Sequence, residues 1–414
     1  MLLLVPGALF AQQPLSLAEA RSIALQQASV FRQAEIDQRI AAEDLRQSKA
    51  TLLPRARDSF SILYNSPVAG TSNQSFIAQN AVHEYQNLIG VTGEWNFGVF
   101  AAIRRGRALL EAARAGTEVA RRDLLRAVDE AYYGAGLAQA KRTAAEQSLS
   151  AAEEFQRITE LNDRAGEVPE VDVIRARLQT AARRDDLAQA RQAEAIAGVS
   201  LGTLLGYDVT RVPSVEPLPP TVDAREIESI SAKEVTRRPE FAQLEARARA
   251  ARAEIGLSRS ELLPRIIYSL DQGFDTDSLN AGTLRQHRGV LATASVDVPI
   301  FDWGLTLSRI RQAELRARKT ETERQLVMRD LYLQFATARQ QALTAAERVD
   351  NARRAVADAE RNVTISIARY RAGEGSIVEA TDALTTQATE RLALQQALFD
   401  YQIARAHLLQ AAGR

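Results

Sequence analysis

One stretch of the chain, from Leu305 to Ala372, contains neither glycine nor proline, and this strongly limits the folds open to it. Its residues are mostly Ala, Arg, Gln, Leu and Glu, which are all good helix formers. A helix of ~67 residues spans ~100 Å, so it needs lateral support of the coiled-coil kind. Two rows with a seven-residue spacing supply a seam for such packing. They are Val349, Val356, Val363 and Tyr370, and Ala345, Ala352 and Ala359. Taken alone, this stretch favours a cytosolic antiparallel coiled coil.

The chain also contains a weak copy of itself. The tetrapeptide 164–167 (Arg-Ala-Gly-Glu) recurs at 371–374, and 52–55 (Leu-Leu-Pro-Arg) recurs at 262–265. These offsets are 207 and 210 residues, and the two tryptophans of the chain lie 208 residues apart. Near-constant offsets between distant markers predict two structural repeats whose loops differ slightly in length.

Each repeat has the same predicted plan of helix, β-hairpin, very long helix, glycine turn and return helix. We expect helices at 15–52, 100–165, 169–205, 226–262, 305–371 and 376–412, and hairpins at about 54–98 and 264–300. The proline-rich segment 208–225 forbids helix and favours an extended linker. It divides a first repeat (12–207) from a second (226–414). Gly166 and Gly373 are expected to cap the long helices with left-handed backbone at two tip turns.

Four short segments alternate between apolar and polar residues, as β-strands with one apolar face do. The apolar positions are Phe60, Ile62 and Tyr64; Ile89, Val91, Trp95 and Phe97; Ile266, Tyr268, Leu270 and Phe274; and Val290, Ala292, Ala294, Val296, Val298 and Ile300. Each segment has roughly the 9–11 residues that cross a bilayer as a tilted strand. A half-buried soluble sheet fits each segment equally well. Four of them in two repeat-equivalent hairpins favour the membrane interpretation.

Four strands are too few to close a barrel, and an open sheet edge is not tolerated in hydrocarbon. One chain is therefore insufficient. Two copies supply eight strands and three supply twelve, and the periodicity does not choose between them. Aromatic residues where the strands end predict a girdle at the lipid–water interface, although buried aromatics at a sheet–helix junction would look similar. They are Trp95, Phe97, Phe301 and Trp303.

Composition excludes several classes of function. Lys plus Arg equals Asp plus Glu at 52 each, with the signs interleaved, which argues against nucleic-acid binding. There is no cysteine, and the three histidines are scattered without metal-ligand spacing. The glycine-rich pieces lack the phosphate-binding motif. We therefore predict no catalytic residue, no cofactor and no metal site, and no enzyme activity.

The first residues, 1–11, resemble the remnant of a secretory signal peptide, which predicts export. They form a short apolar run that ends at Ala11, without a positively charged start. The sequence does not establish where cleavage occurs or whether this terminus is complete. A frayed hydrophobic terminus is the alternative.

The whole plan, from Pro14–Ala20 to Gly413, resembles the TolC family of outer-membrane efflux proteins. Its most specific parts are 370–382, which is similar to the family's helix–turn–helix tip, and 298–304, where the last strand leads into a long helix. The resemblance implies a mostly α fold with β: a homotrimer whose four strands per chain form a 12-stranded outer-membrane β-barrel, continuous with a long periplasmic α-helical barrel. It also implies a periplasmic adaptor (membrane fusion protein) and an inner-membrane pump of the RND, ABC or MFS type as partners.

By position, Glu379 and Asp382 match acidic residues that line the family's pore constriction, and they share one helix face. Two solvated helix acids are the alternative. Tyr370 and Asp172 match residues that hold the family's tip iris closed. Gly375 departs from the basic or polar residue that the family often has there, so that particular contact is expected to be absent.

These expectations favour a passive outer-membrane exit duct of a tripartite efflux or type I secretion system, in contact with outer-membrane lipid and extending into the periplasm of a Gram-negative bacterium. The cargo is left open, from small molecules to polypeptides. The alternative is an extended coiled-coil scaffold or adaptor without channel activity, which would need no lipid-facing strands.

Overall fold

The computed structural model describes residues 14–27, 29–72, 74–77, 80–208 and 212–414. The expected signal segment 1–11 lies outside them. The chain is mostly helical with one four-stranded sheet, as predicted, and it divides into two compact units. The helical unit comprises 1–35, 116–241 and 327–414, and the sheet-bearing unit comprises 36–115 and 242–326. The long helices α3 (Gly98–Arg164) and α8 (Leu305–Arg371) contribute to both units.

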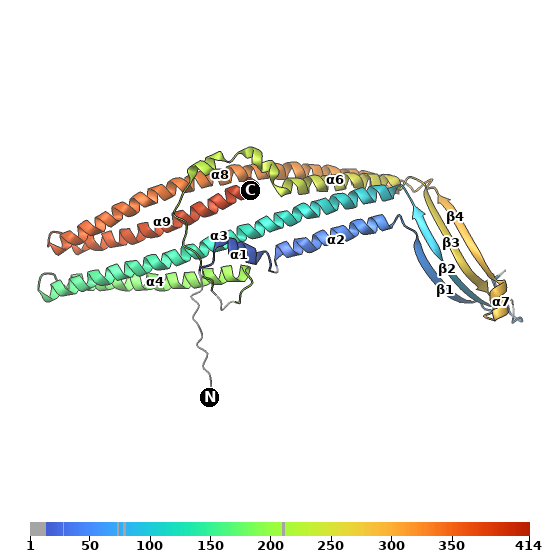
Figure 1. Cartoon of the computed structure of the whole chain (residues 1–414), viewed down its shortest axis with the longest axis horizontal. Helices are drawn as coiled ribbons and strands as arrows, with labels where there is room; N and C mark the ends of the chain where they lie inside the picture. The colour runs from blue at the N-terminus through green and yellow to red at the C-terminus, as the bar shows by residue number, and fades with distance from the viewer. Residues whose placement is uncertain (1–13, 28, 73, 78–79, 209–211) are drawn as a thin grey trace, which may run out of the picture. The chain divides into compact units, whose positions relative to one another are not determined.

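In the helical unit, α3 pairs with α4 and α8 pairs with α9 as two helical hairpins (Figure 1). Its other elements are α4 (Glu170–Leu204), α9 (Ile377–Ala411), α1 (Leu17–Ala24), α5 (Ala224–Ser229) and the 3-10 helix η1 (Ala232–Arg237). The core mixes small and aromatic residues, with Tyr401, Phe335 and Leu201 buried among many alanines. The predicted heptad rows of α8 lie inward, and Ala345, Val349 and Ala359 are buried. Small side chains let these long helices pack closely.

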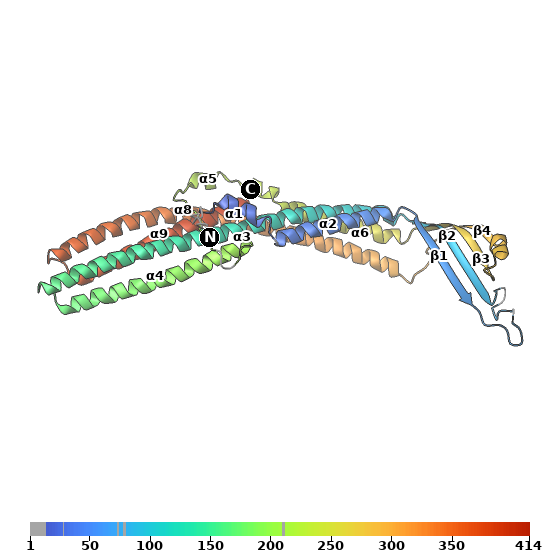
Figure 2. The same cartoon turned by 60° about the horizontal axis from the view of Figure 1, so that its bottom comes forward.

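In the sheet-bearing unit, each strand joins a helix. Its elements are α2 (Val30–Ala50), β1 (Arg55–Tyr64), β2 (His83–Trp95), α6 (Pro239–Ser260), β3 (Arg265–Thr276), α7 (Ala281–Gln286) and β4 (Arg288–Asp297). The sheet is antiparallel with order β1-β2-β3-β4, so β1 and β4 form its edges (Figure 2). Ion pairs between neighbouring helices follow the same order. Arg105 binds Glu254 across α3 and α6, and Arg259 binds Glu314 across α6 and α8.

Two predicted helices are wrong because each is broken. The helix expected at 15–52 stops at Ala24 and restarts at Val30. Gln27 lies in this break, against the turn at Gly206, where an added Cβ would come within 2.5 Å of the Gln27 side-chain oxygen. The helix expected at 226–262 is divided into α5, η1 and α6. Here Arg238 takes the extended backbone favoured before Pro239.

The connection between β3 and β4 contains the short helix α7. The proline-rich linker is extended where it is described, from 212 to 223. It pairs with the start of the chain, since the Leu15 amide donates to the Ser214 carbonyl at 2.8 Å.

Tyr132 of α3 fastens this crossing of two extended segments. Its hydroxyl donates to the Leu15 carbonyl at 2.8 Å and accepts from the Glu216 amide at 3.3 Å. Burial raises the pKa of Tyr132 to about 12, so the hydroxyl stays neutral at physiological pH. A single side chain therefore satisfies backbone groups from both segments.

None of the helices within the described residues is both long enough and apolar enough to span a bilayer.

We predict that Tyr132→Phe lowers the thermal midpoint by several degrees, because two backbone groups lose their partner at a cost of about 1–3 kcal/mol. The neighbouring Tyr133→Phe is the matched control, since Tyr133 is also buried but forms no hydrogen bond among the described residues. Thermal denaturation followed by circular dichroism tests this. Equal midpoints for the two variants would contradict the role given to Tyr132.

Candidate functional site

The register of the sheet sorts its side chains onto two faces. Residues directly opposite on paired strands point to the same side, and successive residues point to opposite sides. Trp95 lies opposite Ile266, which lies opposite Val296, so these three share a face. Applied to every row, this rule assigns the side chains of the four strands to an apolar face or a polar face.

The apolar face holds the alternating residues singled out in the sequence, except Phe97, Val298 and Ile300, which lie beyond the ends of β2 and β4. Its apolar members are Phe60, Ile62, Tyr64, Tyr85, Ile89, Val91, Trp95, Ile266, Tyr268, Leu270, Phe274, Val290, Ala292, Ala294 and Val296. Many are open to solvent in the single chain, with Ile62 63% and Val290 67% exposed. Its polar exceptions include Gln272, and Asp58 with Asn87, which are hydrogen bonded to each other at 2.8 Å. An exposed apolar surface of this extent marks an interaction surface.

The polar face is lined by charged residues, hydroxyls and amides. They are Arg55, Arg57, Ser59, Ser61, Glu84, Gln86, Thr92, Glu94, Arg265, Ser269, Asp271, Asp275, Thr293, Ser295 and Asp297, and the apolar exceptions on this face are Leu63, Leu88, Ile267 and Leu291. Opposite charges are paired across strands, for example Arg265 with Asp297 at 2.7 Å. The sheet can therefore separate an apolar environment on one side from water on the other.

One row of the polar face was not foreseen in the sequence. Arg57 of β1, Gly90 of β2 and Asp271 of β3 lie side by side in register. Because Gly90 has no side chain, Arg57 reaches across it to Asp271 at 3.6 Å. Asp271 is only 2% exposed, and a Cβ at Gly90 would come within 2.3 Å of its carboxylate. The glycine thus makes room for an ion pair that joins three strands.

Aromatic pairs stand where two strands lead toward helices. The rings of Trp95 and Phe97 pack edge to face at 4.7 Å after β2, and those of Phe301 and Trp303 do so at 4.8 Å after β4. Trp303 is 91% exposed and has φ 56°, a left-handed conformation that is rare for a tryptophan. The structure thus gathers the four predicted girdle residues into two equivalent pairs at repeat-related positions.

The tips of the helical unit turn at the predicted glycines. Gly166 and Gly373 have φ of 73° and 70°, which glycine adopts without strain. After each turn an amide returns to the helix end, with Glu167 donating to Asn162 at 2.9 Å and Glu374 to Arg369 at 3.0 Å. Both long helices therefore end in similar glycine caps.

Glu379 and Asp382 lie on the exposed face of the first turns of α9. The opposite face is buried, where Ile377, Ala380 and Leu384 pack with Phe155, Ala176 and Tyr370. Glu379 is also 3.6 Å from Arg369, which ties α9 to the end of α8 across the turn. The arrangement presents both carboxylates outward from the tip of each chain.

Tyr370 is buried, with its ring 5.3 Å from that of Phe155. Its hydroxyl is buried without a hydrogen-bond partner among the described residues. Burial raises the pKa of Tyr370, the nearby Thr159 hydroxyl lowers it, and the charge of Asp172 raises it further. Asp172 is thus close enough to act through its charge, without a direct hydrogen bond to Tyr370 in the single chain.

A second contact between the hairpins was missed in the sequence. The Gln179 amide of α4 donates to the Thr381 carbonyl and to the Thr385 hydroxyl of α9, each at 3.3 Å. No motif marks it, because it depends on how two helices 200 residues apart lie together. Within the described residues, no group of three or more acidic, histidine or cysteine side chains is placed to hold a metal.

Comparison with known proteins shows which family and which structures this chain is similar to. The sequence model of the outer membrane efflux protein family matches residues 20–207 and 232–414. The pyoverdine export outer membrane protein OpmQ of Pseudomonas putida is 23% identical over 278 residues, covering 66% of this chain and 58% of OpmQ. Protein CyaE of Bordetella pertussis is 28% identical over 247 residues, covering 57% of this chain and 51% of CyaE. The matches thus span little more than half the length of these two relatives.

Among solved structures, the CmeC outer membrane channel of Campylobacter jejuni superposes with a TM-score of 0.84 at 17% identity. The superposition covers 96% of this chain and 85% of CmeC. At this identity the likeness concerns the fold.

We predict that Gly90→Ala lowers the thermal midpoint, because the new methyl group displaces Asp271 or the β3 backbone, at a cost of about 1–3 kcal/mol. Gly289→Ala is the control. Gly289 lies on the same polar face in β4, and a Cβ there meets nothing within 4 Å. A midpoint for Gly90→Ala as high as that for Gly289→Ala would contradict the arrangement of this row.

Proposed function

Because the chain belongs to the outer membrane efflux protein family, we propose that it is a passive exit duct that crosses the outer membrane and extends into the periplasm. It catalyses no reaction. Its cargo, small molecules or polypeptides, is delivered by an inner-membrane pump through a periplasmic adaptor. The name of OpmQ concerns export of pyoverdine by that protein, and it supports a small-molecule cargo here without identifying one.

The two-faced sheet carries this proposal. Its apolar face suits hydrocarbon and its polar face suits a water-filled lumen. The strands have 10, 13, 12 and 10 residues, enough to cross a bilayer when tilted. The outer edges of β1 and β4 have no strand partner within the described part of the chain, so a bilayer would leave their backbone groups unsatisfied.

Joining β4 of one copy to β1 of the next removes these edges. Three copies would then form a barrel of twelve strands, the homotrimer that the family resemblance implies. The helices joined to the strands would form a wall in the same order, α2-α3-α6-α8. The aromatic pairs at Trp95 and Trp303 would lie at the periplasmic boundary of the hydrocarbon.

We predict that Val290→Arg blocks assembly in the outer membrane, while Leu291→Arg is tolerated. The two residues are neighbours in β4, and their rows cross the sheet near the middle of β2. Both are exposed in the single chain, but Val290 is on the apolar face and Leu291 is on the polar face. Arginine facing lipid near the midplane costs about 2–4 kcal/mol per site. The amount of heat-modifiable trimer in outer-membrane fractions measures the difference. Equal amounts for both variants would reject lipid contact.

At the tips, Glu379 and Asp382 would form a constriction. Three copies bring six carboxylates together, and such a ring attracts cations and repels anions. Tyr370 and Asp172 would hold the closed arrangement through contacts between hairpins. The support for this is positional: both acids are exposed on one face of α9, while the buried face holds the helix against Phe155 and Tyr370.

We expect Glu379→Gln combined with Asp382→Asn to lower the ratio of cation to anion permeability several-fold, because six charges leave each trimer. Reversal potentials in planar bilayers under a salt gradient measure this ratio. Glu347→Gln with Asp358→Asn is the control, since both are exposed acids of α8 without an ion-pair partner within the described residues. An unchanged permeability ratio in the tip variant would show that these residues do not form the constriction.

A further inference from the structure

A basic groove lies between α3 and α6 in the sheet-bearing unit. It has a volume of about 550 Å³ and is lined by Arg104, Arg107, Arg249 and Arg252, with Glu111 as its one acid. Its remaining lining is small, Ala108, Ala253 and Gly256, so a ligand can approach the helices closely. Four guanidinium groups against one carboxylate make this a site for an anion.

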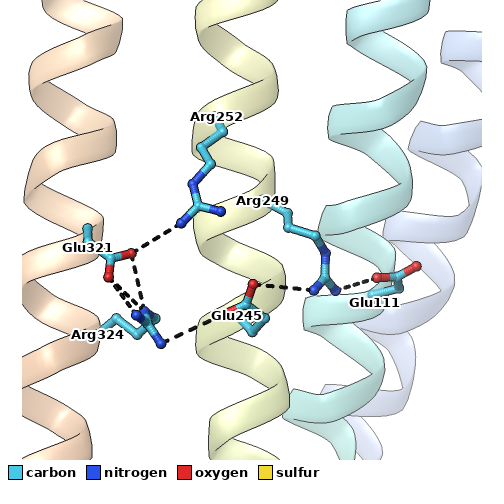
Figure 3. Close-up of polar contacts among 6 residues, drawn as sticks. All are labelled: Glu111, Glu245, Arg249, Arg252, Glu321 and Arg324. Atoms are coloured by element: carbon cyan, nitrogen blue, oxygen red, sulfur yellow. Dashed lines mark hydrogen bonds and ion pairs between the residues drawn. The ribbon is translucent and has the colours of Figure 1, made fainter.

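Two of these four arginines form ion pairs and two do not, within the described residues. Figure 3 shows Arg249 bound to Glu111 at 2.6 Å, and Arg252 bound to Glu321 of α8 at 3.4 Å. Arg324 of α8 forms a further ion pair with Glu245 of α6. By contrast, Arg104 and Arg107 have no ion-pair partner among the described residues. Their guanidinium groups are therefore available to an added anion.

The groove opens on the face of the wall that continues the apolar side of the sheet. Gly98 and Ala102 of α3 line a different pocket, together with Arg55, Thr92 and Glu94 of the polar face. At about 100° per residue, Arg104 and Arg107 point roughly opposite to Ala102. They follow the exposed Phe100 at spacings of four and seven, along one helix face. Phe100 and the two arginines thus lie on the side away from the lumen.

The depth of the groove suits lipid headgroups. Arg104 and Arg107 lie about 9 and 14 Å beyond the start of α3. A headgroup layer adds about 5–8 Å to each side of the hydrocarbon. Long arginine side chains can extend along a helix toward that layer. The groove is also internal to the order α2-α3-α6-α8, so copies that join at the α2 and α8 edges leave it uncovered.

We propose that this groove binds the phosphate group of an anionic phospholipid in the periplasmic leaflet of the outer membrane, with Arg104 and Arg107 as its principal ligands. The inference rests on the proposed membrane insertion. Arg249 and Arg252 contribute from α6 while remaining tied to acids, so the two free arginines set the affinity. A trimer carries three such sites, which fix the height of the duct in the bilayer. A free phosphate ion offers the same chemistry, but it lacks the acyl chains that would lie beside Phe100.

Native mass spectrometry of the detergent-solubilised trimer tests this by counting bound lipids. The purified wild type is incubated with phosphatidylglycerol or phosphatidylethanolamine, each with and without excess inorganic phosphate. We expect up to three phosphatidylglycerol molecules per trimer, retained in preference to phosphatidylethanolamine and not displaced by phosphate. Arg104→Gln with Arg107→Gln is expected to reduce this retention about tenfold or more, since each interfacial arginine contributes about 1 kcal/mol.

Two further variants control for folding and for overall charge. Arg104→Lys with Arg107→Lys keeps both charges and should retain most of the phosphatidylglycerol. Arg114→Gln with Arg318→Gln removes two exposed arginines that lie about 24 and 20 Å along their helices, beyond the reach of headgroups, and should bind like the wild type.

Equal retention by the wild type and the Arg104→Gln, Arg107→Gln variant would overturn the proposal, and so would displacement of the lipid by inorganic phosphate. In both cases the wild type would still insert into liposomes, so the proposed duct would stand. A wild type that enters no bilayer of either composition would overturn the duct and this site together.

Discussion

The backbone hydrogen bonds at the two edges of the sheet are the constraint on which the rest of this protein depends. Four antiparallel strands satisfy one another internally, but β1 and β4 each leave one edge without a strand partner in the described part of the chain. Water can satisfy such groups, whereas hydrocarbon cannot. A chain whose sheet also exposes an apolar face must therefore meet further strands before it enters a membrane. The proposed self-association would follow from the same feature that makes the sheet suited to lipid.

The order of the strands also determines the order of the helices that are joined to them. Each strand joins one helix, so the strand order is also the order of the helical wall, and ion pairs such as Arg105–Glu254 and Arg259–Glu314 fasten neighbouring helices. The tips turn on Gly166 and Gly373, and small residues let the helices of the helical unit pack closely. In the basic groove, Arg249 and Arg252 also bind acids, whereas Arg104 and Arg107 have no ion-pair partner among the described residues.

Periodicity and turn chemistry allowed much of this to be predicted. The strands alternate with period two, and the register confirms that the alternating residues share one face. The glycine caps followed from Gly166 and Gly373. The break before Pro239 has a signal in the sequence, the proline itself, whereas the break at Gln27 depends on packing against Gly206. The Arg57–Gly90–Asp271 row and the contacts of Gln179 could not be predicted, because register and helix pairing join residues far apart in the chain.

The central claim is that the apolar face of the sheet contacts lipid while the polar face contacts water. Because the chain has no cysteine, single cysteines placed at successive positions from Val290 to Val296 can each carry one spin label. Collision rates with oxygen, which concentrates in hydrocarbon, and with a water-soluble nickel chelate would be measured for the protein in liposomes. We expect strict alternation, with oxygen favoured at 290, 292, 294 and 296 and the chelate favoured at 291, 293 and 295. Uniform access of the chelate to all seven positions would contradict it.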